Sequence, residues 1–293
     1  MPELPEVEIT RRGLIPLINQ TVANVVIRNA SMRWPIPAHL PQTLLNQKLI
    51  SLKRRAKYIL AEFSNAHGDT LDNKTADNEK VSGTLLLHLG MSGRICLLDR
   101  NYPPEKHDHF DIAFEGIDGK PGRVLRLRDP RRFGAVLWAG SSPSNHALLK
   151  PLGPEPLEHD FNAQYLFDSI RTRSAAIKVT IMDSHLVVGV GNIYASESLF
   201  RARIHPETPA KNVTLKQCTK LVAEIKATLN DALNAGGSSL RDFFGADSNP
   251  GYFQQEHLVY GRTDELCKVC TKLIKCIRLG QRSTFYCGYC QKQ

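Results

Sequence analysis

Four cysteines near the carboxyl terminus have the spacing of a metal site. Cys267 and Cys270 form one CxxC pair, and Cys287 and Cys290 form a second pair after sixteen residues. Two such pairs place four thiolates at the corners of a tetrahedron, which is the geometry that zinc takes in structural sites. The spacing therefore predicts one structural Zn²⁺ that holds a short hairpin, a zinc ribbon. Cys276 lies between the pairs and is an alternative ligand, although it has no CxxC partner.

The amino terminus carries the second group of residues that could do chemistry. If Met1 is removed, Pro2 exposes a secondary amine, and an ordinary α-amino pKa of about 7.7–8 leaves a useful neutral fraction near pH 7. A secondary amine that attacks a sugar C1′ yields an iminium directly. Glu3 and Glu6 supply carboxylates for proton transfer or for holding the amine. The alternative is that Pro2 and Pro5 only begin a helix.

The charge balance favours a polyanionic partner. The chain has 38 Lys and Arg against 29 Asp and Glu, a net charge of +9. Both ends are basic: residues 1–60 hold nine basic and three acidic side chains, and residues 251–293 hold seven and three. Arg282, on the hairpin between the cysteine pairs, is well placed to hold a phosphate. A solvated basic surface, with Arg282 in a salt bridge, is the alternative.

Composition excludes several classes of protein. With 293 residues, 42% hydrophobic and 23% charged, the chain suits a globular protein of about two domains and is neither disordered nor collagen-like. No apolar run approaches the roughly 18 residues of a membrane span, and no secretory signal pattern opens the chain, so we expect a cytoplasmic protein. The cysteine count of seven is odd, which favours reduced thiols at Cys96, Cys218 and Cys276 over a disulfide framework.

The first half of the chain is predicted to be a β-sandwich or barrel that follows a helical opening at 5–18. Its short runs are rich in Val, Ile, Leu and Phe and are separated by Gly, Pro and Asn. The predicted strands are 22–29, 49–55, 57–63, 83–89, 93–98, 110–116, 123–128 and 133–140. The polar stretch 65–81 is interpreted as a surface insertion.

The second half is predicted to be helical. Apolar residues at spacings of three and four predict helices over 161–173 and 214–235, the second with Thr214 as its N-cap. Residues 177–199 hold a short helix, a glycine turn and a helix from Asn192, whose first N–H groups suit a phosphate.

The whole chain resembles the bacterial formamidopyrimidine-DNA glycosylases, bifunctional enzymes that excise oxidised purines from DNA. The resemblance runs from MPELPEVE at residues 1–8 to FYCGYCQKQ at residues 285–293. The landmarks between them are RRAKY (54–58), HLGMSGR (88–94), KHDHFD (106–111), DPRRFG (129–134), LGPEPL (152–157), MDSHLVVGVGNIYASESLF (182–200), GGSSLRDF (236–243) and PGYFQQEHLVYGR (250–262). The resemblance implies an α+β fold, with an N-terminal β-sandwich and a C-terminal helix-two-turn-helix domain that carries a zinc ribbon.

The resemblance also assigns catalytic roles. Pro2 corresponds to the Schiff-base nucleophile and Glu3 to its proton donor, which opens the deoxyribose ring and protonates the departing base or sugar oxygen. Glu6 corresponds to a supporting residue of the pocket. Lys57 is similar to the lysine that contacts the phosphate beside the lesion and transfers a proton in β-elimination. Arg282 corresponds to the zinc-ribbon arginine that contacts a phosphate and takes part in δ-elimination.

Further residues are expected to contact DNA. Met91, Arg131 and Phe133 correspond to the side chains that fill the hole left by the flipped nucleotide, where an apolar wedge replaces stacking and a guanidinium bonds the orphaned pyrimidine. The residues that contact phosphate or DNA in the family correspond to His107, Arg173 and Asn192. Their neighbours His109 and Lys178 either share this role or are solvated surface groups. Residues 236–255 correspond to a mobile loop that closes over the flipped base.

The implied protein is a monomeric DNA glycosylase and AP lyase of base excision repair that acts on damaged double-stranded DNA at the nucleoid. Its expected domains are a catalytic β-sandwich (1–140), a linker (141–160), a helix-two-turn-helix domain with the lesion loop (161–250) and a zinc-ribbon module (251–293). The alternatives are an endonuclease VIII-like enzyme for oxidised pyrimidines, which typically differs after MPE and lacks the DPRRFG wedge, and a non-catalytic zinc-ribbon DNA-binding protein. The presence of Pro2, Glu3, Glu6 and Lys57 argues against the second.

Overall fold

The computed structural model describes residues 2–65, 80–116, 119, 121–236 and 257–292. Their contacts divide them into two compact units. The first unit comprises residues 2 and 6–150, and the second comprises residues 3–5, 151–236 and 257–292. The division after Lys150 falls inside the predicted linker 141–160. The predicted surface insertion at 65–81 and the predicted mobile loop at 236–255 lie almost entirely outside the described residues.

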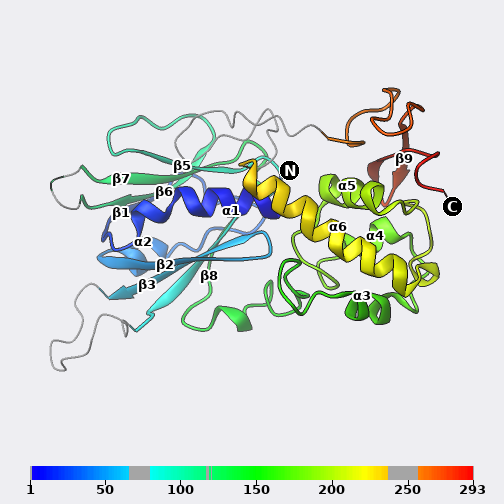
Figure 1. The fold of residues 1–293 in the computed structure, drawn as a ribbon. Helices are drawn as coiled ribbons and strands as arrows, with labels where there is room; N and C mark the ends of the chain where they lie inside the picture. Colours follow the sequence, from blue (N-terminus) through cyan, green and yellow to red (C-terminus); the bar gives the residue numbers. More distant parts are fainter. Residues whose placement is uncertain (1, 66–79, 117–118, 120, 237–256, 293) are drawn as a thin grey trace. The chain divides into compact units, whose positions relative to one another are not determined.

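Two four-stranded antiparallel sheets make up the body of the first unit (Figure 1). One sheet has the order β1-β6-β7-β5 and the other the order β2-β3-β4-β8. The strands are β1 (Val22–Ile27), β2 (Gln47–Arg55), β3 (Tyr58–Asn65), β4 (Gly83–His88), β5 (Arg94–Asp99), β6 (Asp108–Phe114), β7 (Arg123–Arg128) and β8 (Ala135–Trp138). Each overlaps a run predicted from the sequence, so the predicted β-sandwich is confirmed.

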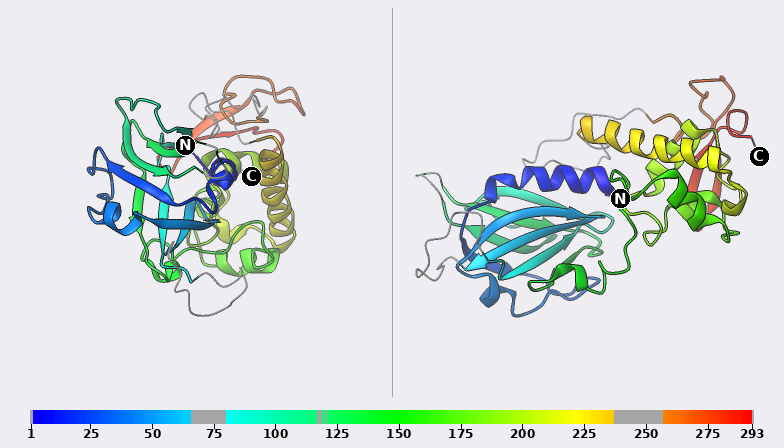
Figure 2. Two further views of the ribbon diagram at one scale, coloured as in Figure 1. Left: turned by 90° about the vertical axis from the view of Figure 1, so that its left-hand side faces the viewer. Right: turned by 60° about the horizontal axis from the view of Figure 1, so that its bottom comes forward.

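One apolar core lies between the inner faces of these sheets. Alternate residues of the strands enter it, for example Leu85 and Leu87 on β4 and Phe110 and Ile112 on β6, which are all buried. The period of two directs one face of each strand into this core, as two sheets packed face to face require. Helix α1 (Leu4–Gly13) runs alongside the strands and adds Val7 to the same core (Figures 1 and 2).

The helical opening predicted at 5–18 is divided in the structure. α1 ends at Gly13, and a 3₁₀ turn follows at Ile15–Leu17. Glycine weakens a helix, and Pro16 has no N–H to donate back to a carbonyl, so the α-helical hydrogen bonds stop here. The first unit also contains α2 (Leu40–Leu44) and a 3₁₀ turn at Pro143–Asn145.

Strand register brings several loops to the same end of the sandwich. In one sheet Tyr58 pairs with His88, and His88 pairs with Ala135, so the turn between β2 and β3 lies beside the loops after β4 and before β8. In the other sheet Arg128 pairs with both Arg94 and Asp108, which adds the loop before β6. Antiparallel pairing therefore gathers four loops that are far apart in the sequence.

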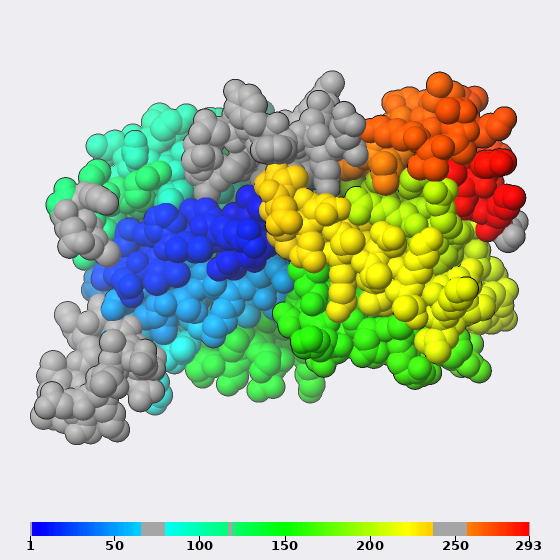
Figure 3. All heavy atoms as spheres, viewed as in Figure 1, coloured from blue at the N-terminus to red at the C-terminus, as the bar shows by residue number. Residues whose placement is uncertain are grey.

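The second unit is helical and ends in a small two-stranded sheet. Its elements are α3 (Ala163–Ile170), α4 (Ile177–Ile181), α5 (Asn192–Ala202), a 3₁₀ turn (Ala210–Asn212), α6 (Leu215–Asn234), β9 (Lys275–Leu279) and β10 (Arg282–Tyr286). Thr214 caps α6 as predicted, in a capping box with Gln217. The atoms of α6 form the yellow ridge in Figure 3. None of the helices in the described ranges combines the length and apolar character needed to cross a membrane.

Candidate active site and nucleic-acid interface

The four predicted zinc ligands meet at one point of the second unit. The Sγ atoms of Cys267 and Cys290 are 4.0 Å apart and those of Cys270 and Cys287 are 3.4 Å apart, and all four lie within 4.8 Å of one another. A tetrahedral zinc with Zn–S bonds of about 2.3 Å needs sulfur–sulfur separations of about 3.8 Å. The thiols therefore fit a structural zinc centre, and Cys276, exposed on β9, is not part of the cluster.

The zinc centre anchors the β9–β10 hairpin to the helices. Cys267, Cys287 and Ile274 form a small buried core with Phe200 of α5. Such a core is too small to hold a hairpin by burial alone, so zinc supplies much of its stability. Arg282 begins β10 and is exposed to solvent, as a phosphate contact requires.

Glu3 lies at the start of α5. Its carboxylate accepts hydrogen bonds from the backbone N–H groups of Gly191 (2.8 Å), Ile193 (3.0 Å) and Tyr194 (3.4 Å), and the side chain is 1% exposed. The N-cap residue Gly191 offers no side chain, and a Cβ there would lie 2.2 Å from the Glu3 carboxyl carbon. The first N–H groups of this helix were predicted to suit a phosphate, but in the structure those of Gly191, Ile193 and Tyr194 bind the carboxylate of Glu3 instead.

Because the resemblance assigns proton transfer to Glu3, we expect its replacement by glutamine to lower base excision by roughly 100-fold or more, the usual contribution of a positioned acid or base. The amide keeps the volume but turns an NH₂ group toward the N–H donors of α5, and it cannot exchange a proton with the sugar. Single-turnover excision on a lesion duplex measures the effect. Glu8→Gln is the matched control, because Glu8 is a glutamate of the neighbouring helix α1 that pairs with Arg11 and Arg12. Equal losses in both variants would contradict the prediction.

Asn192, predicted to contact DNA, is held by a buried lysine. Lys178 Nζ donates to Asn192 Oδ1 (2.6 Å), Thr284 Oγ1 (2.7 Å) and the Ser283 carbonyl (3.2 Å), and Asn192 Nδ2 donates to the same carbonyl (3.0 Å). Burial lowers the pKa of Lys178 to about 8, with the Glu3 carboxylate opposing and Arg282 adding to the shift. Lys178 is 1% exposed, so it is not a solvated surface group.

Arg173 lies beyond the end of α3 and pairs with Asp183, with an Nη1–Oδ2 distance of 2.8 Å. Asp183 has its pKa lowered to about 2: burial opposes the shift, and hydrogen bonds from Arg173 and His185 outweigh it. The Arg173 side chain is 36% exposed, so its guanidinium keeps donors for a phosphate.

Five predicted site residues lie on the loops gathered at one end of the sandwich: Lys57, Met91, His107, Arg131 and Phe133. Lys57 occupies the turn between β2 and β3 and lies close enough to His88 to affect its ionisation. Pro2 also belongs to this unit and is partly exposed, while Glu6, in the first turn of α1, is buried. Their catalytic roles stay predictions.

The three predicted wedge residues are exposed although two are apolar. Met91 is 36% and Phe133 40% exposed, and the Arg131 guanidinium lies 4.8 Å from the centre of the Phe133 ring. Gly90 has φ of +63°, and a Cβ there would lie 2.4 Å from the Phe133 carbonyl carbon, so the two loops touch through their main chains. Core packing, the ordinary role for Met91 and Phe133, is excluded.

His107 and His109 differ in their surroundings. His107 is partly exposed, as a DNA contact requires. His109 is 5% exposed and its Nε2 bonds the Asp129 carbonyl oxygen (2.9 Å), so it supports a loop and is not a surface group. Asp129 itself was not among the site residues predicted from the sequence. It is the first residue of DPRRFG, a run with Pro, Gly and two Arg, and aspartate is a type of residue that organises turns.

His88 is a neutral imidazole at the same end of the sandwich. Burial, Lys57 and Arg33 lower its pKa to about 4, against a smaller opposing effect of Asp129. Nδ1 accepts a hydrogen bond from the Gly90 N–H (3.1 Å), which a protonated ring could not do.

Acid is therefore expected to destabilise the first unit through His88. Because the folded-state pKa lies below the unfolded value of about 6.5, the folded protein binds fewer protons, and stability falls as the pH drops from 6.5 through 4, by at most about 3 kcal/mol. Thermal unfolding at pH 7 and pH 4.5 measures the loss. His88→Gln should show a smaller loss than the wild type, and the exposed His39→Gln should not; identical pH dependence in all three proteins would refute the assignment.

Comparisons with known proteins identify this arrangement. The N-terminal domain of formamidopyrimidine-DNA glycosylase matches residues 1–136, and the H2TH domain of the same enzyme matches residues 152–244. The formamidopyrimidine-DNA glycosylase of Methylobacillus flagellatus is 63% identical over 292 residues, which cover all of this chain and 97% of that one.

Solved structures agree with these sequence matches. Fpg (MutM) of Lactococcus lactis, in complex with DNA that contains N7-benzyl-Fapy-dG, superposes with a TM-score of 0.84 at 30% identity and complete coverage of both chains. The MutM (Fpg) protein of Thermus thermophilus gives 0.83 at 32% identity, with 100% of this chain and 99% of that chain covered. The β-sandwich, the helical unit and the four-thiol centre thus define a class of DNA glycosylases that carry a zinc ribbon. Within it, the chain belongs to the formamidopyrimidine-DNA glycosylase family.

Proposed function

We propose that the protein is a bifunctional DNA glycosylase and AP lyase of base excision repair that removes oxidised purines, with 8-oxoguanine and formamidopyrimidines as its substrates. The observation that carries this proposal is Glu3, buried at the N-terminus of α5 and adjacent in sequence to Pro2. A carboxylate fixed by three N–H donors next to a secondary amine is suited to amine-based attack on a sugar. The 63% identical relative is named for the same activity.

The chemistry begins once Met1 has been removed. The Pro2 nitrogen attacks C1′, the bond from C1′ to the base breaks, and the base leaves with the bonding electrons and takes up a proton. Ring opening transfers a proton to O4′ and leaves an iminium between Pro2 and C1′. Glu3 moves these protons, and Glu6 supports the pocket.

Two eliminations then cut the strand. Loss of a proton from C2′, assisted by Lys57, expels the 3′ phosphate, and a second elimination, in which Arg282 holds the departing phosphate, expels the 5′ phosphate. Each step exchanges a C–H and a C–O bond for a double bond, so no oxidant is needed. Water then hydrolyses the iminium, which releases the sugar remnant as an aldehyde and restores the Pro2 amine. The product is a gap flanked by phosphates.

Both units supply contacts to DNA. Met91, Arg131 and Phe133 fill the hole left by the flipped base. Phosphate contacts come from His107, Arg173, Asn192 and Arg282. The zinc holds the ribbon that carries Arg282 and takes no part in the reaction. We also propose that the protein works as a monomer, without an obligate protein partner, on cytoplasmic nucleoid DNA. Its proposed domains are the catalytic sandwich at 1–140, the linker at 141–160, the lesion-binding helical domain at 161–250 and the zinc-ribbon module at 251–293.

A substrate panel tests the proposal. The protein is incubated with duplexes that hold 8-oxoguanine, a formamidopyrimidine or 5-hydroxycytosine, and strand cleavage is measured with and without later alkali. We expect cleavage without alkali at both oxidised purines and markedly slower cleavage at the pyrimidine. Preference for 5-hydroxycytosine would favour the endonuclease VIII-like alternative, and cleavage only after alkali would remove the lyase step.

A further inference from the structure

We propose that Asp129 is the positioning residue that fixes the DNA-facing loops of the first unit. Through it the loops of Met91, of Arg131 and Phe133, and of His107 are held as one rigid surface. The inference rests on the proposed function, because the wedge and phosphate roles of those loops are part of it. Asp129 itself is completely buried, so it acts on DNA only through the residues that it holds.

The carboxylate of Asp129 joins two of the loops. Oδ1 accepts hydrogen bonds from the Ser92 hydroxyl (2.7 Å) and the Arg131 N–H (3.2 Å), and Oδ2 accepts one from the Gly134 N–H (2.8 Å). Ser92 follows Met91 directly, and its Oγ also accepts from the Arg131 N–H (3.3 Å). One side chain therefore fixes the loop after β4 against both ends of the segment that carries Arg131 and Phe133.

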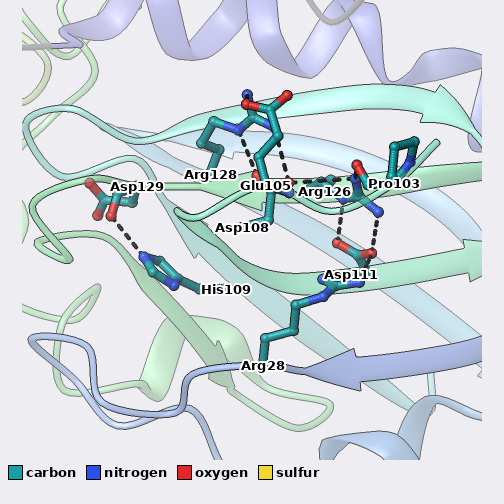
Figure 4. Close-up of polar contacts among 9 residues, drawn as sticks. All are labelled: Arg28, Pro103, Glu105, Asp108, His109, Asp111, Arg126, Arg128 and Asp129. Carbon is teal, nitrogen blue, oxygen red and sulfur yellow. Dashed lines mark hydrogen bonds and ion pairs between the residues drawn. The ribbon is translucent and has the colours of Figure 1, made fainter.

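The main chain of Asp129 joins the third loop. Its N–H donates to the His107 carbonyl (3.0 Å), and its carbonyl accepts from His109 Nε2 (2.9 Å) and from the Arg132 N–H (3.2 Å). Figure 4 shows the His109 ring directed at Asp129 from the neighbouring strand. His107 is thus attached through its backbone to the same residue that holds the wedge.

The charge of the buried Asp129 carboxylate is compensated by these hydrogen bonds, so they are costly to break. The donors to the Asp129 carboxylate described above are a hydroxyl and two N–H groups, which are neutral, and a buried carboxylate is tolerated only when such bonds satisfy it. Asp111, in the same unit, is different, because it forms ion pairs with Arg126 and Arg28 (Figure 4). If a wedge loop moved, the carboxylate oxygens of Asp129 would lose their hydrogen-bond donors. Every other arrangement of these loops is therefore less stable.

The loops also contain backbone that needs such support. Arg132 has φ of +57°. A non-glycine residue in the left-handed region is strained and persists only where its surroundings fix it. Arg132 lies between Arg131 and Phe133, so this strained residue separates the two wedge side chains, and its N–H is bonded to the Asp129 carbonyl.

The experiment compares Asp129→Asn with Asp111→Asn. Excision of 8-oxoguanine opposite cytosine gives kcat/KM, and a 2-aminopurine next to the lesion reports wedge insertion by its fluorescence. We expect Asp129→Asn to lower kcat/KM by roughly 10- to 100-fold, the effect of displacing binding groups by about 1 Å, and to reduce the fluorescence change. Asp111→Asn should lower the melting temperature and keep both readouts, because the ion pairs of Asp111 go to Arg28 and Arg126, which are outside the wedge loops. Equal loss of excision in both variants at matched folded fraction would overturn the inference.

A double-mutant cycle separates this inference from the proposed function. Phe133→Ala should weaken excision, and Asp129→Asn should add little to it, because both act through the same loop. Additive losses would overturn the positioning role, whereas excision by Phe133→Ala at the wild-type rate would overturn the wedge role instead. Ser92→Ala, which removes a single donor, is the second variant if Asp129→Asn does not fold, and it should also couple to Phe133→Ala.

Discussion

Borohydride is expected to trap the protein covalently on a duplex that holds one 8-oxoguanine opposite cytosine. Reduction of the iminium between the Pro2 nitrogen and C1′ gives a stable amine, which gel electrophoresis detects as a protein–DNA band. In a form extended by one or more residues before Pro2, the proline nitrogen is an amide whose lone pair is delocalised into the carbonyl group, so it cannot attack C1′ and the band should be absent.

Pro2→Gly tests the same step with a terminal amine that is altered but still present. Glycine still offers a terminal amine, but it is a primary amine on a backbone that the pyrrolidine ring no longer restrains. We expect trapping to slow by about 100-fold, as for a reacting group displaced from its working position. Binding of the lesion duplex should be nearly unchanged, because Pro2 carries no proposed phosphate contact. Full trapping by the extended form would place the nucleophile elsewhere, with the buried Lys178 and the turn residue Lys57 as the amines to test next.

Removal of zinc is expected to abolish specific DNA binding. The small core around Cys267 and Cys287 cannot hold β9 and β10 alone, and zinc bound by four thiolates supplies about 10–16 kcal/mol of folding free energy. Loss of the hairpin removes Arg282 and frees Lys178 and Asn192 from Ser283 and Thr284. A chelator should release one zinc per chain, and affinity measured by fluorescence anisotropy should fall to the non-specific level, roughly 1,000-fold weaker or more.

Two cysteine variants make the zinc test specific. Cys270→Ser removes a ligand and should lose both the metal and the affinity. Cys276→Ser removes a thiol of the same module that lies outside the cluster, and it should keep one zinc and wild-type binding. Metal-free protein that binds the lesion duplex normally would refute the structural role of zinc, and loss of zinc from Cys276→Ser would return Cys276 to the ligand set.

Elements with strong local signals could be predicted from the sequence. The capped helix α6 is predicted within one residue at each end, because Thr214 and Gln217 form a capping box and Gly236 adopts φ of +82° after the helix. The predicted helix over 161–173 is shorter in the structure, Ala163–Ile170, because Asn162 caps it by accepting from the Tyr165 N–H and Arg171 ends it. Helix ends depend on such single hydrogen bonds, which apolar spacing does not reveal.

The zinc centre and the identity of the candidate site residues were determined by the sequence alone. Metal-ligand spacing is a property of a short stretch of chain, and the motifs from MPELPEVE to the second cysteine pair occur in a fixed order. The surroundings of those residues were decided only by the tertiary structure. Glu3 meets the N-terminus of α5 after a separation of 188 residues, Lys178 meets β10 after 105, and Asp129 meets Ser92 after 37. Burial and hydrogen bonding at these positions arise from contacts distant in sequence, so no local pattern could show that Lys178 and His109 are buried supports or that Asp129 joins three loops.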